Sequence, residues 1–202
     1  MSITLSNWVY ISDEVAADVN YFVVAARPNT SATMAATTLA STHNGGGRNV
    51  TVTTAGSADS GKTATITGTD VAGADLTEVI TLPGSATTTA GTKIFLTVTA
   101  VEMSTQPAAN IEVGFGTACG AKIGGGGVFG SYRVTSGGTG GTVTFRTSGT
   151  AGDVISTDLT GGSAGTNGSM VSAHGTGAKL VNGMYVTYTL DVADQIIAFY
   201  AG

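Results

Sequence analysis

The chain has few charged residues, few aromatic residues and almost no cysteine. Charged residues make up 10% of its 202 residues, whereas a typical soluble domain carries about 25%. It has 8 Lys and Arg residues against 13 Asp and Glu residues, which gives a net charge of −5. Proteins that grip duplex DNA without sequence preference neutralise its phosphates with clustered cations. The composition therefore argues against nucleic acid as a partner.

Cysteine and long apolar runs are scarce too. Cys119 is the one cysteine, so the chain cannot form an internal disulfide. No apolar run of about 18 residues occurs, which argues against a membrane-spanning helix. Residues 1–5 (MSITL) have neither the basic region nor the apolar stretch of a secretory signal. We therefore expect a protein that is made in a cytoplasm and has no redox role.

Small and β-branched residues are abundant, and they favour strands. Gly, Thr, Ala and Ser together make up more than half of the chain, and Thr and Gly are poor helix formers. Apolar and polar residues alternate most strictly over residues 184–192, a period of two that predicts a strand. Further strands are predicted at residues 49–53, 63–69, 76–82, 92–103, 110–114, 127–135, 142–146, 153–159 and 195–200. The sequence therefore predicts an all-β protein.

Four consecutive glycines, residues 124–127, mark the predicted domain boundary. Glycine has the greatest backbone freedom of any residue, so such a run suits a linker. Many short strands separated by turn signals are typical of sandwiches and barrels. We therefore predict two β-sandwich or barrel-like domains: residues 1–123 with an N-terminal arm, then the Gly linker 124–127, then residues 128–202.

Residues 56–63 (GSADSGKT) match the phosphate-loop pattern. In that motif, backbone N–H groups hold phosphates, the lysine (here Lys62) reaches the terminal phosphates, and the last residue (here Thr63) binds Mg²⁺. A helix must follow the loop so that its N-terminus faces the phosphates. Residues 63–69 instead alternate with a period of two, which predicts a strand. We therefore interpret the match as a hairpin loop.

Two groups of residues could suggest a metal site or a catalytic site. Asp70, Asp75 and Glu78 lie close together but do not have the spacing of a calcium loop, so we interpret them as turn-capping Asp residues and an exposed strand Glu. His43, His174 and Cys119 are the candidate bases and nucleophiles, but no Gly-x-Ser-x-Gly elbow accompanies them. We therefore predict a protein that is not an enzyme, with no catalytic, cofactor-binding or metal site.

The densest group of aromatic residues lies near the N-terminus and has two interpretations. Its members are Trp8, Tyr10, Tyr21 and Phe22. They are core residues, since large aromatics are mostly buried, or they anchor an N-terminal arm on a partner, since aromatics contribute strongly to interfaces.

The strand and turn motifs resemble those of tailed-bacteriophage virion proteins. The first half resembles a β-domain common in such proteins, through residues 48–53, 64–70, 73, 76–84, 92–95, 98, 101 and 111–114. The second half is similar to small phage head proteins, through residues 141–145, 182–186 and 199–200. This resemblance implies a structural protein of the virion.

Among virion proteins, the resemblance implies first a capsid decoration (cement) protein. Such a protein, made in the host cytoplasm, binds the outer capsid surface, and its partners are the major capsid protein and neighbouring copies of itself in an oligomeric arrangement. Sheet edges with few Lys residues are poorly protected, which favours pairing with a partner. The alternatives are a phage tail or head–tail component and, in a different class, a carbohydrate-binding adhesin.

Overall fold

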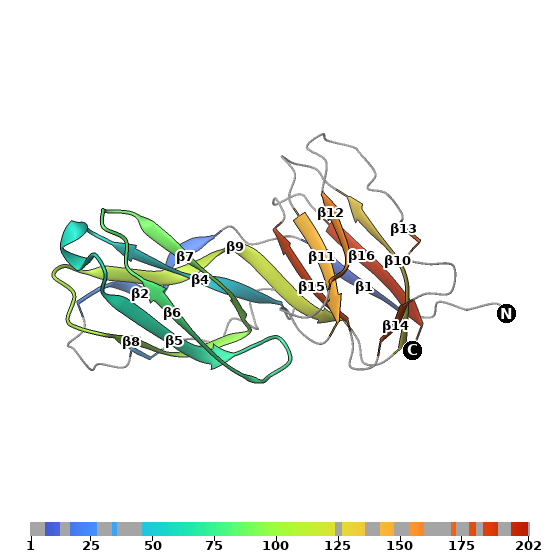
Figure 1. The fold of residues 1–202 in the computed structure, drawn as a ribbon, viewed down its shortest axis with the longest axis horizontal. Helices are drawn as coiled ribbons and strands as arrows, with labels where there is room; N and C mark the ends of the chain where they lie inside the picture. Colours follow the sequence, from blue (N-terminus) through green and yellow to red (C-terminus); the bar gives the residue numbers. More distant parts are fainter. Residues whose placement is uncertain are drawn as a thin grey trace. The chain divides into compact units, whose positions relative to one another are not determined.

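The computed structural model is built almost entirely of strands (Figure 1). It describes residues 7–12, 17–27, 34–35, 46–123, 127–135, 142–147, 154–159, 171–172, 178–180, 184–189 and 195–201. The one helical turn among these residues is the short 3-10 helix η2 (Ser57–Asp59). No helix in the described ranges is long and apolar enough to cross a membrane. The predicted all-β class is confirmed.

The chain divides into two compact units. The central unit is Ala16–Cys119, and the terminal unit combines Met1–Val15 with Gly120–Gly202. This differs from the predicted division at residues 124–127, because strand β1 (Asn7–Ser12) pairs with the last strand of the chain. Residues 124–126 lie outside the described residues, and Gly127 is the first residue of a strand.

The central unit contains two sheets. The β4 sheet has the order β2-β9-β4-β7, and the β5 sheet has the order β3-β8-β5-β6. The strands of the β4 sheet are β2 (Asp18–Ala26), β9 (Ile111–Ile123), β4 (Gly47–Thr54) and β7 (Thr88–Phe95). Those of the β5 sheet are β3 (Met34–Ala35), β8 (Thr97–Met103), β5 (Thr63–Thr69) and β6 (Asp75–Thr81). The β5 sheet is antiparallel throughout.

One apolar core draws side chains from both sheets of the central unit. Its members include Val50 and Val52 of β4, Ile66 of β5, Val101 of β8 and Phe115 of β9, all fully buried or nearly so. The alternation seen in the sequence explains this, because every second residue of a strand points to the same face. The Thr residues between them point away from the core.

The terminal unit is also built from two groups of strands. In one, the order is β1-β16-β10-β13, with β14 also paired to β10; its further strands are β16 (Gln195–Ala201), β10 (Gly127–Thr135), β13 (Val171–Ser172) and β14 (Ala178–Leu180). In the other, β12 (Val154–Leu159), β11 (Thr142–Thr147) and β15 (Met184–Thr189) are neighbours in that order, and β9 lies next to β15. Buried Val143, Phe145 and Val186 supply apolar side chains here.

The predicted strand at residues 92–103 is wrong in one respect. The structure divides it into β7 and β8, which belong to different sheets. The break is at Leu96, whose N–H donates to the carbonyl of Thr69 at 2.7 Å. Ile94 and Phe95 are both buried, so the period of two fails there and the chain crosses from one sheet to the other.

Candidate functional site

The phosphate-loop match lies between two sheets. The connection runs from β4 through η2 to Thr63, the first residue of β5. A strand therefore stands where nucleotide binding requires a helix. The interpretation as a hairpin loop is wrong, because β4 and β5 belong to different sheets and do not pair. Gly61 has a φ of +78°, a conformation that glycine adopts without strain. The backbone conformation of the loop therefore explains why a glycine stands at this position, without any phosphate ligand.

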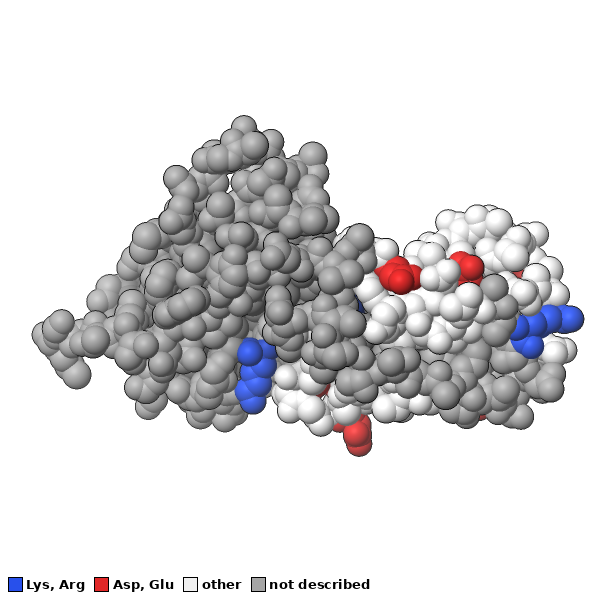
Figure 2. Space-filling model, turned by 180° about the vertical axis from the view of Figure 1, so that it is seen from behind, with Lys and Arg blue, Asp and Glu red and all other residues white. Residues whose placement is uncertain are grey.

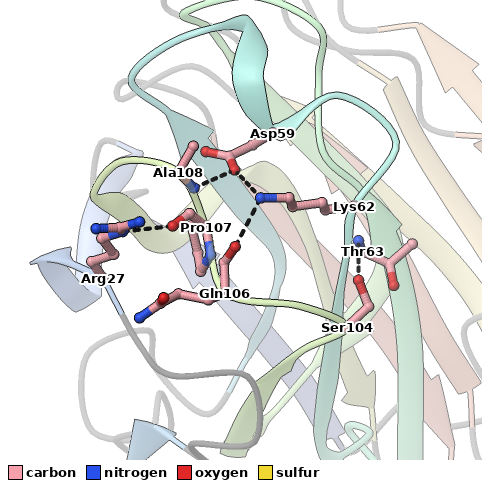
Figure 3. A network of polar contacts seen from close by, with 8 residues as sticks. All are labelled: Arg27, Asp59, Lys62, Thr63, Ser104, Gln106, Pro107 and Ala108. Carbon is pink, nitrogen blue, oxygen red and sulfur yellow. Dashed lines mark hydrogen bonds and ion pairs between the residues drawn. The ribbon is translucent and has the colours of Figure 1, made fainter.

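Lys62 of the motif binds the protein itself. Its Nζ donates to Asp59 Oδ1 and to the carbonyl of Gln106, each at 2.8 Å. Asp59 Oδ1 also accepts the N–H of Ala108 at 2.7 Å. Figure 3 shows the Lys62 and Asp59 side chains pointing toward one another beside the chain segment that carries Ala108. The pair thus fastens the β4–β5 connection to the β8–β9 connection.

A second contact fixes the same β8–β9 connection. Arg27, which follows β2, donates from Nε to the carbonyl of Pro107 at 2.6 Å (Figure 3). Ser104 Oγ accepts the N–H of Thr63 at 3.0 Å, at the start of β5. Side chains and backbone groups from several segments of the central unit therefore meet at this connection, and we call them the Asp59 network.

The Asp59 carboxyl is the buried acid of this network, with 1% of its surface exposed. Burial is the largest influence on the pKa of Asp59 and raises it. The hydrogen bond from Lys62, the N–H of Ala108, the charge of Lys62 and the N–H of Ala109 together outweigh burial, so the pKa lies below its ordinary value. Asp59 therefore stays ionised and is held by donors within the protein.

The lowered pKa makes the stability of the fold depend on pH. A carboxyl group whose pKa is lower in the folded chain stabilises the fold above its unfolded pKa, about 3.9 for Asp, and this contribution is lost as the pH falls through the folded value. Asp59→Asn should therefore be less stable than the wild type near neutral pH. The difference should shrink below about pH 4 as Asp59 of the wild type becomes protonated.

Urea unfolding of both proteins from about pH 7 down to about pH 2 measures this difference across the range in which carboxyl groups titrate. Ser57→Ala is the matched control, since Ser57 is an exposed residue of the same loop. Its stability curve should run parallel to that of the wild type. A constant gap between Asp59→Asn and the wild type at every pH would contradict the prediction.

Asp70 is used in a turn, as predicted. Its Oδ1 accepts the N–H groups of Ala72 at 2.8 Å and Ala74 at 2.9 Å. Gly73 has a φ of +85° and donates its N–H to the carbonyl of Asp70 at 2.9 Å. β5 and β6 pair on either side of this loop, so the predicted hairpin is confirmed.

The interpretation of Glu78 as an exposed strand residue is wrong. Glu78 is only 8% exposed, because it shares the inward face of β6 with buried Ile80. Its Oε1 accepts the N–H of Thr92 at 2.7 Å, the hydroxyl of Thr92 at 3.1 Å and the N–H of Lys93 at 3.2 Å. The carboxylate thus ties the edge strand of the β5 sheet to β7 of the β4 sheet.

The other candidate bases and nucleophiles are not brought together among the described residues. His43 and His174 lie outside the described residues. Cys119 is buried, and its thiol donates to the carbonyl of Thr117 at 3.2 Å. No group of three or more His, Cys, Asp or Glu residues in the described part of the chain could hold a metal ion.

The N-terminal aromatic residues fall into two different units. Trp8 and Tyr10 are in β1, which pairs with β16 in the terminal unit. Phe22 belongs to the core of the central unit, and Tyr21 packs against that core. The Tyr21 ring meets Phe115 edge-on, with ring centroids 5.1 Å apart. Core packing is therefore the role of Tyr21 and Phe22.

Two buried polar residues of β4 escaped the sequence analysis. The guanidinium of Arg48 lies over the Phe115 ring, 5.2 Å from its centroid, and donates to the carbonyl of Gly116 at 3.1 Å. Asn49 donates to the carbonyl of Gly91 at 3.0 Å and accepts the N–H of Ala118 at 3.0 Å. The sequence signal was slight, since Arg-Asn before an alternating strand is typical of an exposed strand start.

No protein-family model matches this chain, and no curated protein sequence matches it either.

Proposed function

We propose that this chain is a non-enzymatic structural protein of a tailed-phage virion, a decoration protein that binds the outer capsid surface and bridges neighbouring major capsid subunits. One observation supports the proposal that the protein is not an enzyme. Four ionisable side chains in or near the candidate motifs, Asp59, Lys62, Asp70 and Glu78, bind groups of the protein itself. Catalytic groups instead need access to a substrate.

The surface is consistent with a role in contact rather than chemistry. Figure 2 shows one face of the molecule. In the described part of that face, a few charged residues stand among uncharged areas. Uncharged small side chains lose little hydration energy and little side-chain entropy when a partner covers them. The placement on a phage capsid is supported by the resemblance of the strand and turn motifs to phage virion proteins.

Two compact units suit a bridge between shell subunits. If each unit binds one subunit, the second binding event is intramolecular, so two weak contacts add up to a firm attachment. Such an attachment would hold the shell against the outward pressure of packaged DNA.

Cryo-electron microscopy of phage particles that contain this chain tests the proposal. We expect density on the outer shell that spans adjacent capsid subunits. Particles assembled without the chain should release their DNA at a lower temperature, and adding the purified protein should restore the higher one. Density confined to the tail would replace the capsid role with that of a tail component. Absence from the particle would overturn the virion role altogether.

A further inference from the structure

Strand β2 is the longest edge strand of the central unit. Among the described residues it pairs with β9 alone, so its other side has no partner strand there. The other edges are short or occupied: β3 has two residues, the Lys93 side chain binds the carbonyl of Thr77 in β6, and the Glu78 carboxylate binds N–H groups of β7. β2, with nine residues, is the edge for which the described residues show no such protection.

β2 also exposes apolar side chains to water. Val24 is 72% exposed and Val19 is 38% exposed. They are two of the three exposed large apolar residues in the described part of the chain, and the third is Val79 of β6. Phe22 and Val23, which lie between them, belong to the core and hold β2 in place. A long edge strand with exposed apolar side chains is typical of a surface that pairs with another chain.

The charges of β2 stand only at its two ends. Asp18 begins the strand and the exposed Arg27 follows its last residue, whereas residues 19–26 between them are uncharged. If two copies lie antiparallel with their centres opposite each other, Asp18 of each copy faces Arg27 of the other, and Val24 faces Tyr21. The segment is thus complementary to itself, as a contact about a twofold axis requires.

Both end residues have the hydrogen-bonding capacity for this contact. Asp18 Oδ1 accepts the N–H of Asn20 at 3.1 Å, and a carboxylate can accept several further hydrogen bonds. Arg27 Nε donates to the carbonyl of Pro107 at 2.6 Å, and a guanidinium has further N–H donors. Because the bond to Pro107 already restrains the Arg27 side chain, pairing it with a second copy costs less entropy.

The backbone of β2 limits what kind of contact two copies can make. β2 matches β9 at Asp18, Val23 and Ala26, and the register shifts in both intervals. Such shifts bend a strand and interrupt its ladder. A contact between two copies therefore depends on the exposed side chains and the end charges, and not on a long unbroken backbone ladder.

We propose that two copies of this chain associate through β2, antiparallel about a twofold axis near Phe22 and Val23. Val19 and Val24 supply the apolar contact as they lose water, and ion pairs between Asp18 of one copy and Arg27 of the other fix the orientation. The inference goes beyond the proposed function, since purified protein without any capsid tests it. Its failure leaves the capsid role untouched.

Two matched variants test the apolar contact. Val24→Lys and Val79→Lys each place a cation at an exposed valine, but only Val24 lies in β2. Sedimentation equilibrium over a range of protein concentrations measures the dissociation constant of the dimer. We expect Val24→Lys to raise this constant roughly tenfold or more and Val79→Lys to leave it unchanged. A wild type that stays monomeric at every concentration, or equal constants for the two variants, overturns the inference.

Exchanging the end charges tests the antiparallel arrangement. Asp18→Arg sets like charges opposite Arg27, and Arg27→Asp sets like charges opposite Asp18, so each variant alone should associate more weakly than the wild type. An equimolar mixture of the two should form mixed dimers as tight as those of the wild type, because each new charge then meets its opposite. Thermal unfolding shows that each variant folds, and the Val24→Lys comparison decides the matter if one does not. A mixture that associates no better than its components contradicts the arrangement.

Discussion

Replacing Glu78 by alanine is expected to lower the free energy of unfolding by about 3 kcal/mol, the upper range for hydrogen bonds to a charged group. The carboxylate accepts the N–H groups of Thr92 and Lys93 and the hydroxyl of Thr92. Removing it leaves these donors of β7 without their acceptor in a site that is only partly accessible to water. It also removes one of the side-chain links between the two sheets.

Chemical denaturation of Glu78→Ala and of Glu102→Ala measures this effect. Glu102 is an exposed Glu of the same sheet, and its replacement should leave the stability unchanged. Glu78→Gln keeps the shape and one acceptor, so it should lose less stability than Glu78→Ala. If Glu78→Ala is as stable as Glu102→Ala, the buried carboxylate contributes nothing and our account of it fails.

Replacing Gly68 by alanine should be similarly damaging, at about 3 kcal/mol, the upper end of the usual cost of overpacking. Gly68 lies in β5 where the register with β8 shifts. A Cβ at this position would overlap the carbonyl oxygen of Thr97, a backbone atom that cannot rotate away. The two strands would have to separate locally, which would break backbone hydrogen bonds between β5 and β8.

Gly56→Ala is the matched control for Gly68→Ala. Gly56 has an extended backbone with a φ of −177°, and a Cβ there would meet nothing within 4 Å. Its replacement should therefore be neutral or slightly stabilising, because it restricts the unfolded chain. Equal stability losses in the two variants, measured by thermal unfolding, would show that the close approach at Gly68 does not govern the effect.

Two edges of the central unit are better protected than their low Lys content suggested. Lys93 Nζ of β7 donates to the carbonyl of Thr77 in β6 at 2.7 Å. In return, the Glu78 carboxylate of β6 accepts the N–H groups of Thr92 and Lys93 in β7. The Lys93 side chain thus occupies part of the β6 edge, and the Glu78 side chain occupies part of the β7 edge. This arrangement disfavours the addition of a further strand at these two edges.

Local sequence patterns were sufficient to predict the class of the fold and several of its elements. Alternation of apolar and β-branched residues predicted β10 with its bounds, Gly127–Thr135, and the hairpin of β5 and β6 around Asp70 and Gly73. These are local features, since a period of two and a turn residue act between neighbours in the chain. The same local pattern argued against a helix after Lys62, and β5 confirms this.

Local patterns did not predict which strands share a sheet or which groups the polar side chains bind. Glu78 has the sequence context of an exposed residue, yet it accepts hydrogen bonds from N–H groups of β7, a strand of the other sheet. Lys62 is bound by the carbonyl of Gln106, 44 residues away in the chain. β1 joins the last strand rather than the strands that follow it. Each of these contacts joins segments that are distant in sequence, so no local pattern encodes them.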